Sequence, residues 1–344
     1  MTITSKLTAL EFLIPSYKRP LTLIHAVESV AKQIEELKLS ERVKITIVDD
    51  CSPNLDIDEI INAISSFSSF VSFKQNDANK GMSLNIRDMA ANSNADFCTV
   101  LTDDDRLQPN SLKEIIQTLD SLNNNIGSFF VPRYSYLEDV SLLCIVCNPF
   151  DEDKKIEPSY LNSLKYLHNG FILTGLFFRP QIINFQIWDE NIENSFFPVI
   201  YFADLLSNHH CLFINKNWFI HTVLNECHWD SWGTTEQMRL SRLYKDYMEA
   251  VTVSAKRASL KRSGVLLAMH LFKEEVACYQ NQIQSTLPNL SKQNRIVSKM
   301  ASSRLAYHLA LANYRIRSNV NILRVPLSKI KQKILALLNK ILRS

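Results

Sequence analysis

Two groups of aspartates each stand at the end of a short apolar run. Asp103–Asp105 follow residues 97–101, and Asp49–Asp50 follow residues 43–48. Apolar runs of this length predict buried strands, so each acidic group should emerge at the carboxyl end of a strand. Neighbouring carboxylates repel one another unless a cation or a donor-rich ligand compensates them. Because Mg²⁺ and Mn²⁺ prefer oxygen ligands and often share them with substrate phosphates, the pattern predicts a metal–diphosphate site.

A second interpretation of Asp103–Asp105 is an acidic turn that caps the helix expected over residues 109–122. The elements around the acids bear on this choice. The apolar patterning predicts strands over residues 12–14, 43–48, 71–73 and 97–101, separated by helices over residues 21–38, 57–67 and 83–91. Alternating strands and helices predict a largely parallel sheet that binds ligands at the carboxyl ends of its strands. Both acidic groups fall on that edge, which favours a binding site.

Composition limits the classes of protein that the chain can belong to. The 344 residues are 46% hydrophobic and include only six glycines, none spaced as GxGxxG or as a phosphate-binding loop. Dinucleotide and Walker-type nucleotide binding are therefore not expected. The first nine residues lack the apolar core of a secretory signal, and no apolar run reaches membrane-spanning length. Seven cysteines without framework spacing fit a reducing compartment, so we expect a cytoplasmic protein.

Charge is distributed unevenly along the chain. Residues 239–344 hold twenty Lys or Arg and four Asp or Glu, a net charge of +16, whereas residues 1–238 carry −13. Residues 327–341 combine an apolar stripe with lysines, as an amphipathic helix on an anionic membrane surface does. The alternative is a helix that packs on its own protein or on a second subunit, so an oligomer stays possible. Nucleic acid is not expected, because the tail lacks interleaved aromatic residues.

Four motifs in the first third of the chain resemble a known family. They are FLIPSYKR at residues 12–19, ITIVDDCS at residues 45–52, NKG at residues 79–81 and LTDDD at residues 101–105, with Pro109 four residues on. In order and spacing they resemble family 2 glycosyltransferases. The resemblance implies an α/β fold of the GT-A type, a Rossmann-like sandwich with a mostly parallel central sheet. We expect this domain over residues 1–235 and a basic helical C-terminal extension over residues 236–344.

The resemblance also implies roles for individual residues in binding a nucleotide-sugar donor. Asp50 would accept hydrogen bonds from the base, and Asp103 would meet the ribose or the metal shell. Asp104 would bind Mn²⁺ or Mg²⁺ that bridges the diphosphate, and Asp105 would be a second ligand or the cap of the next helix. The remaining donor-site residues are Pro15, Ser16, Tyr17, Arg19, Asn79, Gly81 and Arg87.

An inverting transferase also needs a carboxylate that deprotonates the acceptor hydroxyl. Residues 203–206 resemble the acidic motif that supplies this base, which implies that Asp204 is the catalytic residue. Asp189, Glu190 and Glu193 are alternatives. His228, followed by Trp229-Asp230-Ser231-Trp232, is expected to close over the diphosphate or to bind the metal.

The expected function is therefore transfer of a sugar, most simply from a UDP-sugar, to a hydroxyl of a glycan or lipid-linked glycan with inversion. The basic tail suggests bacterial surface polysaccharide assembly at the inner face of the cytoplasmic membrane. Two other classes stay open. A sugar nucleotidyltransferase shares a similar sheet but needs a glycine-rich N-terminal loop that this chain lacks. A non-catalytic binding or scaffold protein is also compatible, because Thr102 and Ala203 replace acids that are common in the family.

Overall fold

The computed structural model describes most of the first two thirds of the chain. The described residues are 8–137, 142–146, 152–159, 162–163, 166, 170, 173–194, 196–223, 250 and 253. The expected domain boundary at residues 235 and 236, His228 and the amphipathic stripe of the tail lie outside them.

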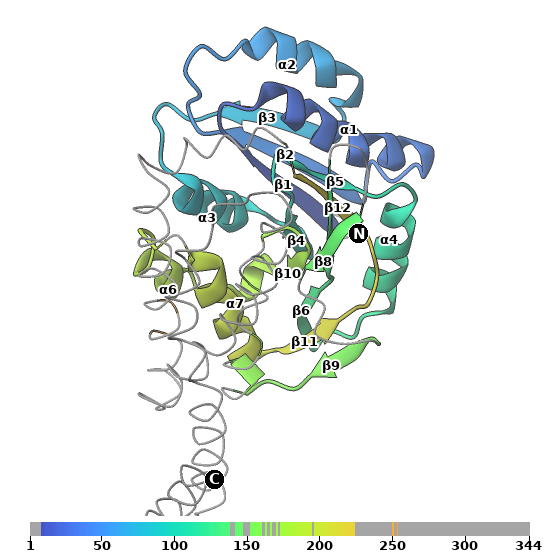
Figure 1. Ribbon diagram of the computed structural model, residues 1–344, viewed down its shortest axis with the longest axis vertical. Coiled ribbons are helices and arrows are strands. Elements are labelled where there is room, and N and C mark those ends of the chain that lie inside the picture. Colours follow the sequence, from blue (N-terminus) through green and yellow to red (C-terminus); the bar gives the residue numbers. More distant parts are fainter. Residues whose placement is uncertain are drawn as a thin grey trace, which may run out of the picture.

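A twisted central sheet forms the middle of the described part of the molecule (Figure 1). Its eight strands run in the order β3 (Val71–Gln75), β2 (Val43–Asp49), β1 (Leu10–Ser16), β4 (Phe97–Val100), β10 (Leu176–Phe178), β6 (Ile126–Phe130), β11 (His210–Phe213) and β9 (Lys154–Ile156). The pairs β3–β2, β2–β1, β1–β4 and β6–β11 are parallel, while β10 and β9 are antiparallel to their neighbours. The predicted, mostly parallel α/β sheet is confirmed.

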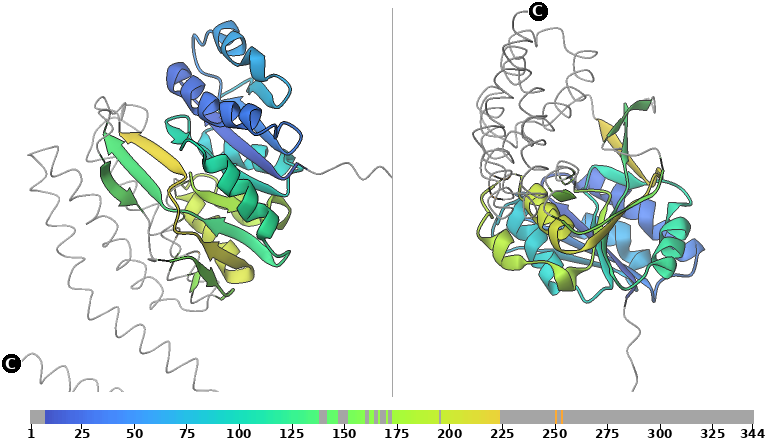
Figure 2. Two further views of the ribbon diagram at one scale, coloured as in Figure 1. Left: turned by 90° about the vertical axis from the view of Figure 1, so that its right-hand side faces the viewer. Right: turned by 90° about the horizontal axis from the view of Figure 1, so that it is seen from below.

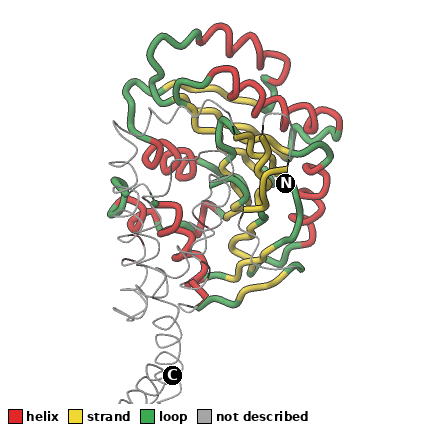
Figure 3. Tube along the Cα trace, in the orientation of Figure 1, coloured by secondary structure: helices red, strands yellow, loops and turns green. Residues whose placement is uncertain are grey.

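Helices cover both faces of this sheet, as the tube view in Figure 3 makes clear. One face packs against α1 (Pro20–Glu36), α2 (Ile57–Ile64) and α4 (Ser111–Ser121), and the other against α3 (Met82–Asn92), α6 (Phe185–Asp189) and α7 (Phe197–Asn208). Successive strand residues point to opposite faces. In β1, Phe12 and Ile14 therefore pack on the face covered by α1, α2 and α4, whereas Leu13 packs on the face covered by α3, α6 and α7.

A smaller sheet lies beside the central one (Figure 2). It consists of β5 (Asp105–Leu107), β12 (Phe219–Val223), β7 (Arg133–Leu137) and β8 (Leu142–Val146), in that order. Strand β5 begins only a few residues after β4 ends, so the acidic stretch Asp103–Asp105 spans the passage from one sheet to the other. The two sheets together therefore frame the acidic stretch.

Two local features complete the fold. Strand β10 is three residues long. Directly before it, Gly175 has φ +98° and lies so close to Val131 that an added Cβ would stand 2.8 Å from the Val131 carbonyl oxygen. The helix after the acids begins at Ser111 and its N-cap position is Asn110, which makes no side-chain cap hydrogen bond, so the acidic-turn interpretation is wrong. No helix among the residues that the structure describes is long and apolar enough to cross a membrane.

Candidate active site

The carboxyl ends of β1, β2 and β4 meet at one edge of the central sheet. In the parallel registers, Ser16 lies opposite Asp49, and Leu13 lies opposite Val100. The chain therefore leaves β2 at Asp50 and leaves β4 just before Asp103 on the same edge as Tyr17. The expectation that both acidic groups fall on the carboxyl edge is confirmed.

Arg19 joins the two acids that follow β4. Its Nη1 atom lies 3.0 Å from Oδ1 of Asp103 and 3.1 Å from Oδ2 of Asp104. Burial raises the pKa of Asp103 to about 7, an effect that Asp104 reinforces and that Arg19 opposes. For Arg19, burial disfavours the charge, but the two carboxylates outweigh it and its pKa is raised. The site thus contains one cation whose charge compensates two acids.

Asp105 lies apart from this group in its local structure. It is the first residue of β5, is fully buried, and its backbone pairs with His221 of β12. Because the following helix starts only at Ser111 and is preceded by Asn110, the role of Asp105 as a helix cap is wrong. Its role as a second metal ligand stays a prediction.

The residues at this edge suit a divalent cation that a substrate shares. Asp103 and Asp104 supply carboxylate oxygens, and Mg²⁺ commonly uses one or two protein carboxylates with waters and substrate phosphates. No cluster of three or more His, Cys, Asp or Glu side chains with metal-binding geometry occurs among the described residues. Asp103 and Asp104 fit an ion that is held jointly with a diphosphate.

Residues 15–17 line the same edge through their backbone. Pro15 and Ser16 are buried, and the Ser16 carbonyl accepts a hydrogen bond of 2.9 Å from the Asp50 N–H. The Tyr17 N–H points to Oδ2 of Asp103 at 3.5 Å, and the Tyr17 side chain is half-buried. Of these three residues, Tyr17 has the exposed surface that a ligand could contact.

The turns after β1 and β2 hold each other in place. The Lys18 N–H donates to Oγ of Ser52 at 2.7 Å, and Ser52 donates its hydroxyl and its N–H to the two carboxylate oxygens of Asp49, at 2.6 and 2.8 Å. Lys18 and Cys51 have φ values of +60° and +58°, which are unusual for residues other than glycine. Such strained backbone is concentrated at functional sites in proteins.

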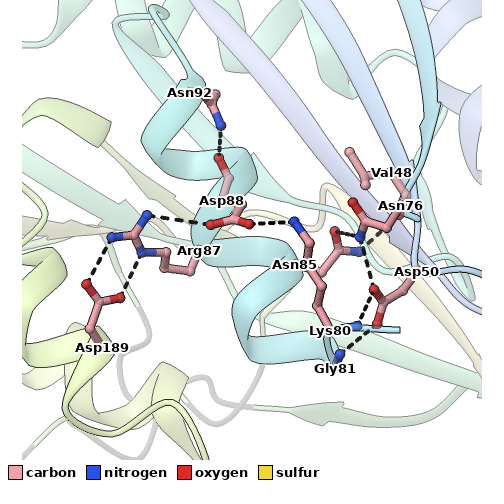
Figure 4. A network of polar contacts seen from close by, with 10 residues as sticks. All are labelled: Val48, Asp50, Asn76, Lys80, Gly81, Asn85, Arg87, Asp88, Asn92 and Asp189. Atoms are coloured by element: carbon pink, nitrogen blue, oxygen red, sulfur yellow. Dashed lines mark hydrogen bonds and ion pairs between the residues drawn. The ribbon is translucent and has the colours of Figure 1, made fainter. Parts of the chain in front are cut away.

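Asp50 anchors the loop between β3 and α3 (Figure 4). Its carboxylate accepts hydrogen bonds from the N–H of Gly81 at 2.8 Å, the N–H of Lys80 at 2.9 Å and Nδ2 of Asn76 at 3.0 Å. A carboxylate has about four acceptor positions, so these donors leave one for a ligand. Asp50 thus holds this loop in place through three hydrogen bonds.

Two residues that the sequence analysis did not select complete this anchor. Asn76 also donates to Asn85 at 3.1 Å, and Asn85 donates to the Val48 carbonyl at 3.0 Å. Asn85 is buried beside Ile86 and Met89 on the covered face of α3. An amide on the apolar face of a helix is a detectable signal, because a buried polar group needs a partner.

Asn79 and Gly81 shape the loop itself. Oδ1 of Asn79 accepts a hydrogen bond of 3.1 Å from the Gly81 N–H. Gly81 has φ +80° and ψ 153°, a combination open essentially only to glycine. A Cβ added there would meet no atom within 4 Å, so the backbone conformation requires glycine and the available space does not.

Arg87 is part of α3, and its side chain reaches Asp189 of α6 (Figure 4). It makes two contacts with the Asp189 carboxylate, at 2.8 and 2.9 Å, and its guanidinium lies 5.1 Å from the centre of the Phe185 ring. Both polar contacts join α3 to α6, and Asp189 is engaged by them. A role of Arg87 at the phosphates stays a prediction, and it would require this ion pair to open.

Asp204 lies toward the amino ends of the parallel strands, whereas Asp103 and Asp104 lie at their carboxyl ends. Strands β4 and β6 are both antiparallel to β10 and hence parallel to each other, and β11 is parallel to β6. Since α7 ends at Asn208, directly before β11, its last turns lie where these strands begin. Asp204 is in this part of the helix, is buried, and accepts a hydrogen bond of 2.9 Å from Asn208. The fold therefore does not bring it together with Asp103 and Asp104.

The segment between α6 and α7 lies near the carboxyl ends of the strands instead. Nε1 of Trp188 donates to Oγ of Ser83 at 3.3 Å, and Ser83 is in the first turn of α3, beside the Asp50 loop. Glu190 and Glu193 follow Trp188 in this segment, and both are exposed. These two acids are on the side of the sheet where the diphosphate is expected.

Comparisons with known proteins agree with this architecture. Residues 11–181 match the family model described as glycosyl transferase family 2, a segment that contains all four motifs. The solved structure of S. aureus TarS 1–349 in complex with UDP-GlcNAc is similar, with a TM-score of 0.50, 15% identity, and coverage of 89% of this chain and 91% of that one. The complex of the same protein with UDP has a TM-score of 0.48, 15% identity and the same coverage.

At this identity, the likeness to TarS concerns the fold alone. No curated protein matches the sequence significantly. The family match rests on the segment that builds the carboxyl edge, from β1 to the residues after β10. Residues 11–181 therefore form a glycosyl transferase family 2 domain, and the chain has the GT-A fold that its motifs predicted.

Proposed function

We propose that the protein transfers a sugar from a nucleoside diphosphate sugar, most simply a UDP-sugar, to a hydroxyl acceptor with inversion. The observation that carries this proposal is the group of Arg19, Asp103 and Asp104 at the carboxyl edge, next to the Asp50 loop. Arg19 can bind phosphate oxygens and the two carboxylates can hold a metal ion, so this group suits a diphosphate. The uridine assignment is supported by the solved complexes of TarS with UDP-GlcNAc and UDP.

We assign each residue of this edge to one part of the nucleotide-sugar donor. Tyr17 would contact the nucleoside, and Asp50 would use its remaining acceptor position for the imide N–H of the base. Arg19 is one-third exposed and can turn toward a phosphate without unfolding its surroundings. Asp103 and Asp104 would hold Mn²⁺ or Mg²⁺. Such an ion, when bound, neutralises the negative charge that develops on the departing diphosphate.

The general base should lie on the same side of the sheet as the donor. In-line attack requires the acceptor hydroxyl opposite the leaving diphosphate, within hydrogen-bond reach of a carboxylate. Glu193 and Glu190 are favoured by their position in the turn before α7, whereas Asp204 is favoured only by its motif. We therefore propose Glu193 as the base, with Glu190 and Asp204 as the alternatives.

The acceptor proposal rests on charge. Residues 239–344 carry a net charge of +16 in the sequence. A basic, amphipathic segment of this kind supports binding to an anionic membrane and, through it, a glycan or lipid-linked glycan acceptor of bacterial surface polysaccharide assembly at the inner face of the cytoplasmic membrane.

Calorimetric titration of UDP, GDP and dTDP, each with and without Mn²⁺, tests the donor proposal. Metal-dependent binding of UDP alone is the expected result. Absence of binding to all three nucleotides would contradict the proposal and favour a non-catalytic protein. Release of pyrophosphate from a sugar phosphate and UTP would instead identify a nucleotidyltransferase.

A further inference from the structure

Arg19 lies where a divalent cation would have to bind. Its Nη1 atom contacts Oδ1 of Asp103 and Oδ2 of Asp104 at 3.0 and 3.1 Å, so a single nitrogen bridges both carboxylates. These side chains are 8% and 26% exposed, and that of Arg19 is 33% exposed. The Arg19 side chain is thus the most exposed member of the group.

A metal ion and this guanidinium cannot use the same oxygens together. Both are cations, and Arg19 already contacts Oδ1 of Asp103 and Oδ2 of Asp104. A metal that arrives alone must displace Arg19, which then loses two charge-assisted hydrogen bonds without a replacement. A metal that arrives with a diphosphate brings the replacement, because phosphate oxygens are good acceptors for arginine.

The attachment of Arg19 allows such an exchange. Arg19 is the residue directly before α1, and its backbone is held by the Leu23 N–H, which donates to the Arg19 carbonyl at 3.0 Å. The side chain has no partner other than the two acids among the contacts of the described residues. Rotation of its flexible side-chain torsions can therefore move the guanidinium while the backbone stays in place.

We propose that Arg19 is an exchangeable counter-ion that keeps a divalent metal out of the ligand-free site and moves to the diphosphate when metal and nucleotide bind together. This inference rests on the proposed donor site. It makes Arg19 a positioning residue that couples metal binding to nucleotide binding. Metal alone would bind weakly, and the complete metal–nucleotide pair would bind well.

The test measures Mn²⁺ binding directly, without turnover. Free Mn²⁺ is followed by electron paramagnetic resonance as it is titrated into the full chain, with and without saturating UDP. For the unaltered protein, UDP should strengthen Mn²⁺ binding by about tenfold or more, the scale of one charge-assisted contact. In Arg19→Gln, Mn²⁺ affinity without UDP should rise by a similar factor of about ten, and the further gain from UDP should shrink.

Arg42→Gln is the matched control. Arg42 also pairs with an aspartate, Asp120, but that pair joins the segment before β2 to α4 and lies outside the candidate site. Its loss should leave Mn²⁺ binding unchanged. Equal Mn²⁺ affinity of Arg19→Gln and the unaltered protein in the absence of UDP would overturn the inference.

A second variant covers the case in which Arg19→Gln does not fold. Lysine in Arg19→Lys keeps the charge but lacks the fork of the guanidinium. It should strengthen Mn²⁺ binding without UDP, though less than glutamine, and no change in the folded lysine variant would overturn the inference. Failure of the unaltered protein to bind UDP under any condition would count against the donor site, whereas the nucleotide-free Mn²⁺ comparison tests Arg19 itself.

Discussion

Asp103 and Asp104 differ in burial although they are neighbours in sequence. The Asp103 side chain is 8% exposed and that of Asp104 is 26% exposed, and both contact Arg19. The more exposed carboxylate is the better placed to take part in a shared metal–diphosphate complex. The more buried one is fixed by Arg19 and by the Tyr17 N–H.

Asp104→Ala should therefore remove metal-dependent nucleotide binding and keep the fold. On the proposed metal role, loss of this carboxylate should weaken UDP binding in Mn²⁺ by about tenfold or more, since changes to residues that only orient metal ligands already cost metal sites 10–100-fold. Calorimetry in Mn²⁺ measures this effect. Asp58→Ala, at an exposed position of α2, is the control. Unchanged UDP affinity of Asp104→Ala would remove Asp104 from the metal site.

The identity of the general base can be decided by a pair of isosteric variants. Glu193→Gln should keep UDP binding and lower turnover by about 10²-fold or more, the usual effect of losing a general base. Asp204→Asn should lower turnover much less, because Asp204 lies toward the opposite edge of the sheet. Single-turnover kinetics with UDP-sugar and acceptor give both values. The reverse ranking would assign the base to Asp204.

At the scale of elements, the β3–α3 loop is determined by one glycine and one carboxylate. Gly81 provides a backbone conformation that other residues avoid, and its N–H donates to Asp50 at 2.8 Å. The amide network of Asn76 and Asn85 then joins this loop to β2. The loop is thereby held before any ligand binds.

Gly81→Ala should destabilise the protein by about 1–3 kcal/mol, the cost of a residue held in a sparsely populated backbone region. Free space around the new Cβ excludes a steric origin for this loss. Urea unfolding measures the effect. Cys51→Gly makes the opposite change at φ +58° and should be neutral or slightly stabilising. Equal stability of Gly81→Ala and the unaltered protein would show that the loop does not depend on this conformation.

At the scale of the whole molecule, the candidate site joins segments from three strand ends. The proposed nucleotide–metal complex would lie at this edge and should stabilise the sheet that β1, β2 and β4 share. UDP with Mn²⁺ at about 100 times the dissociation constant should add about 2.7 kcal/mol of stability. For a domain of this size, the melting temperature would rise by roughly 5–10 °C.

Thermal melts with UDP, with Mn²⁺, and with both measure this stabilisation. Only the combination should reach the full increase, and removal of Mn²⁺ by EDTA should reverse it. A full increase with UDP alone would mean that the nucleotide binds without metal. In that case, Asp103 and Asp104 would act only as partners of Arg19.

Much of the architecture was predictable from local pattern. The apolar runs before Asp49 and Asp103 predicted β2 and β4, and the helical spacing from Leu23 to Leu37 predicted α1. The parallel arrangement then placed both acidic groups at one edge, because the carboxyl ends of parallel strands coincide. The small sheet was not predicted, since its strands pair over long sequence distances and β5 is only three residues long.

The sequence alone thus determined the family, the order of the elements and the edge at which the acids emerge, since these depend on residue types and short-range spacing. Only the tertiary structure decided which groups meet. Arg19 reaches acids 84 and 85 residues away, and Arg87 reaches Asp189 across 102 residues. The same applies to Asp204, whose motif suggested a catalytic position. Helix α7 leads directly into β11, and a helix that precedes a strand ends where that strand begins. Asp204, near the end of α7, therefore lies toward the amino ends of the strands.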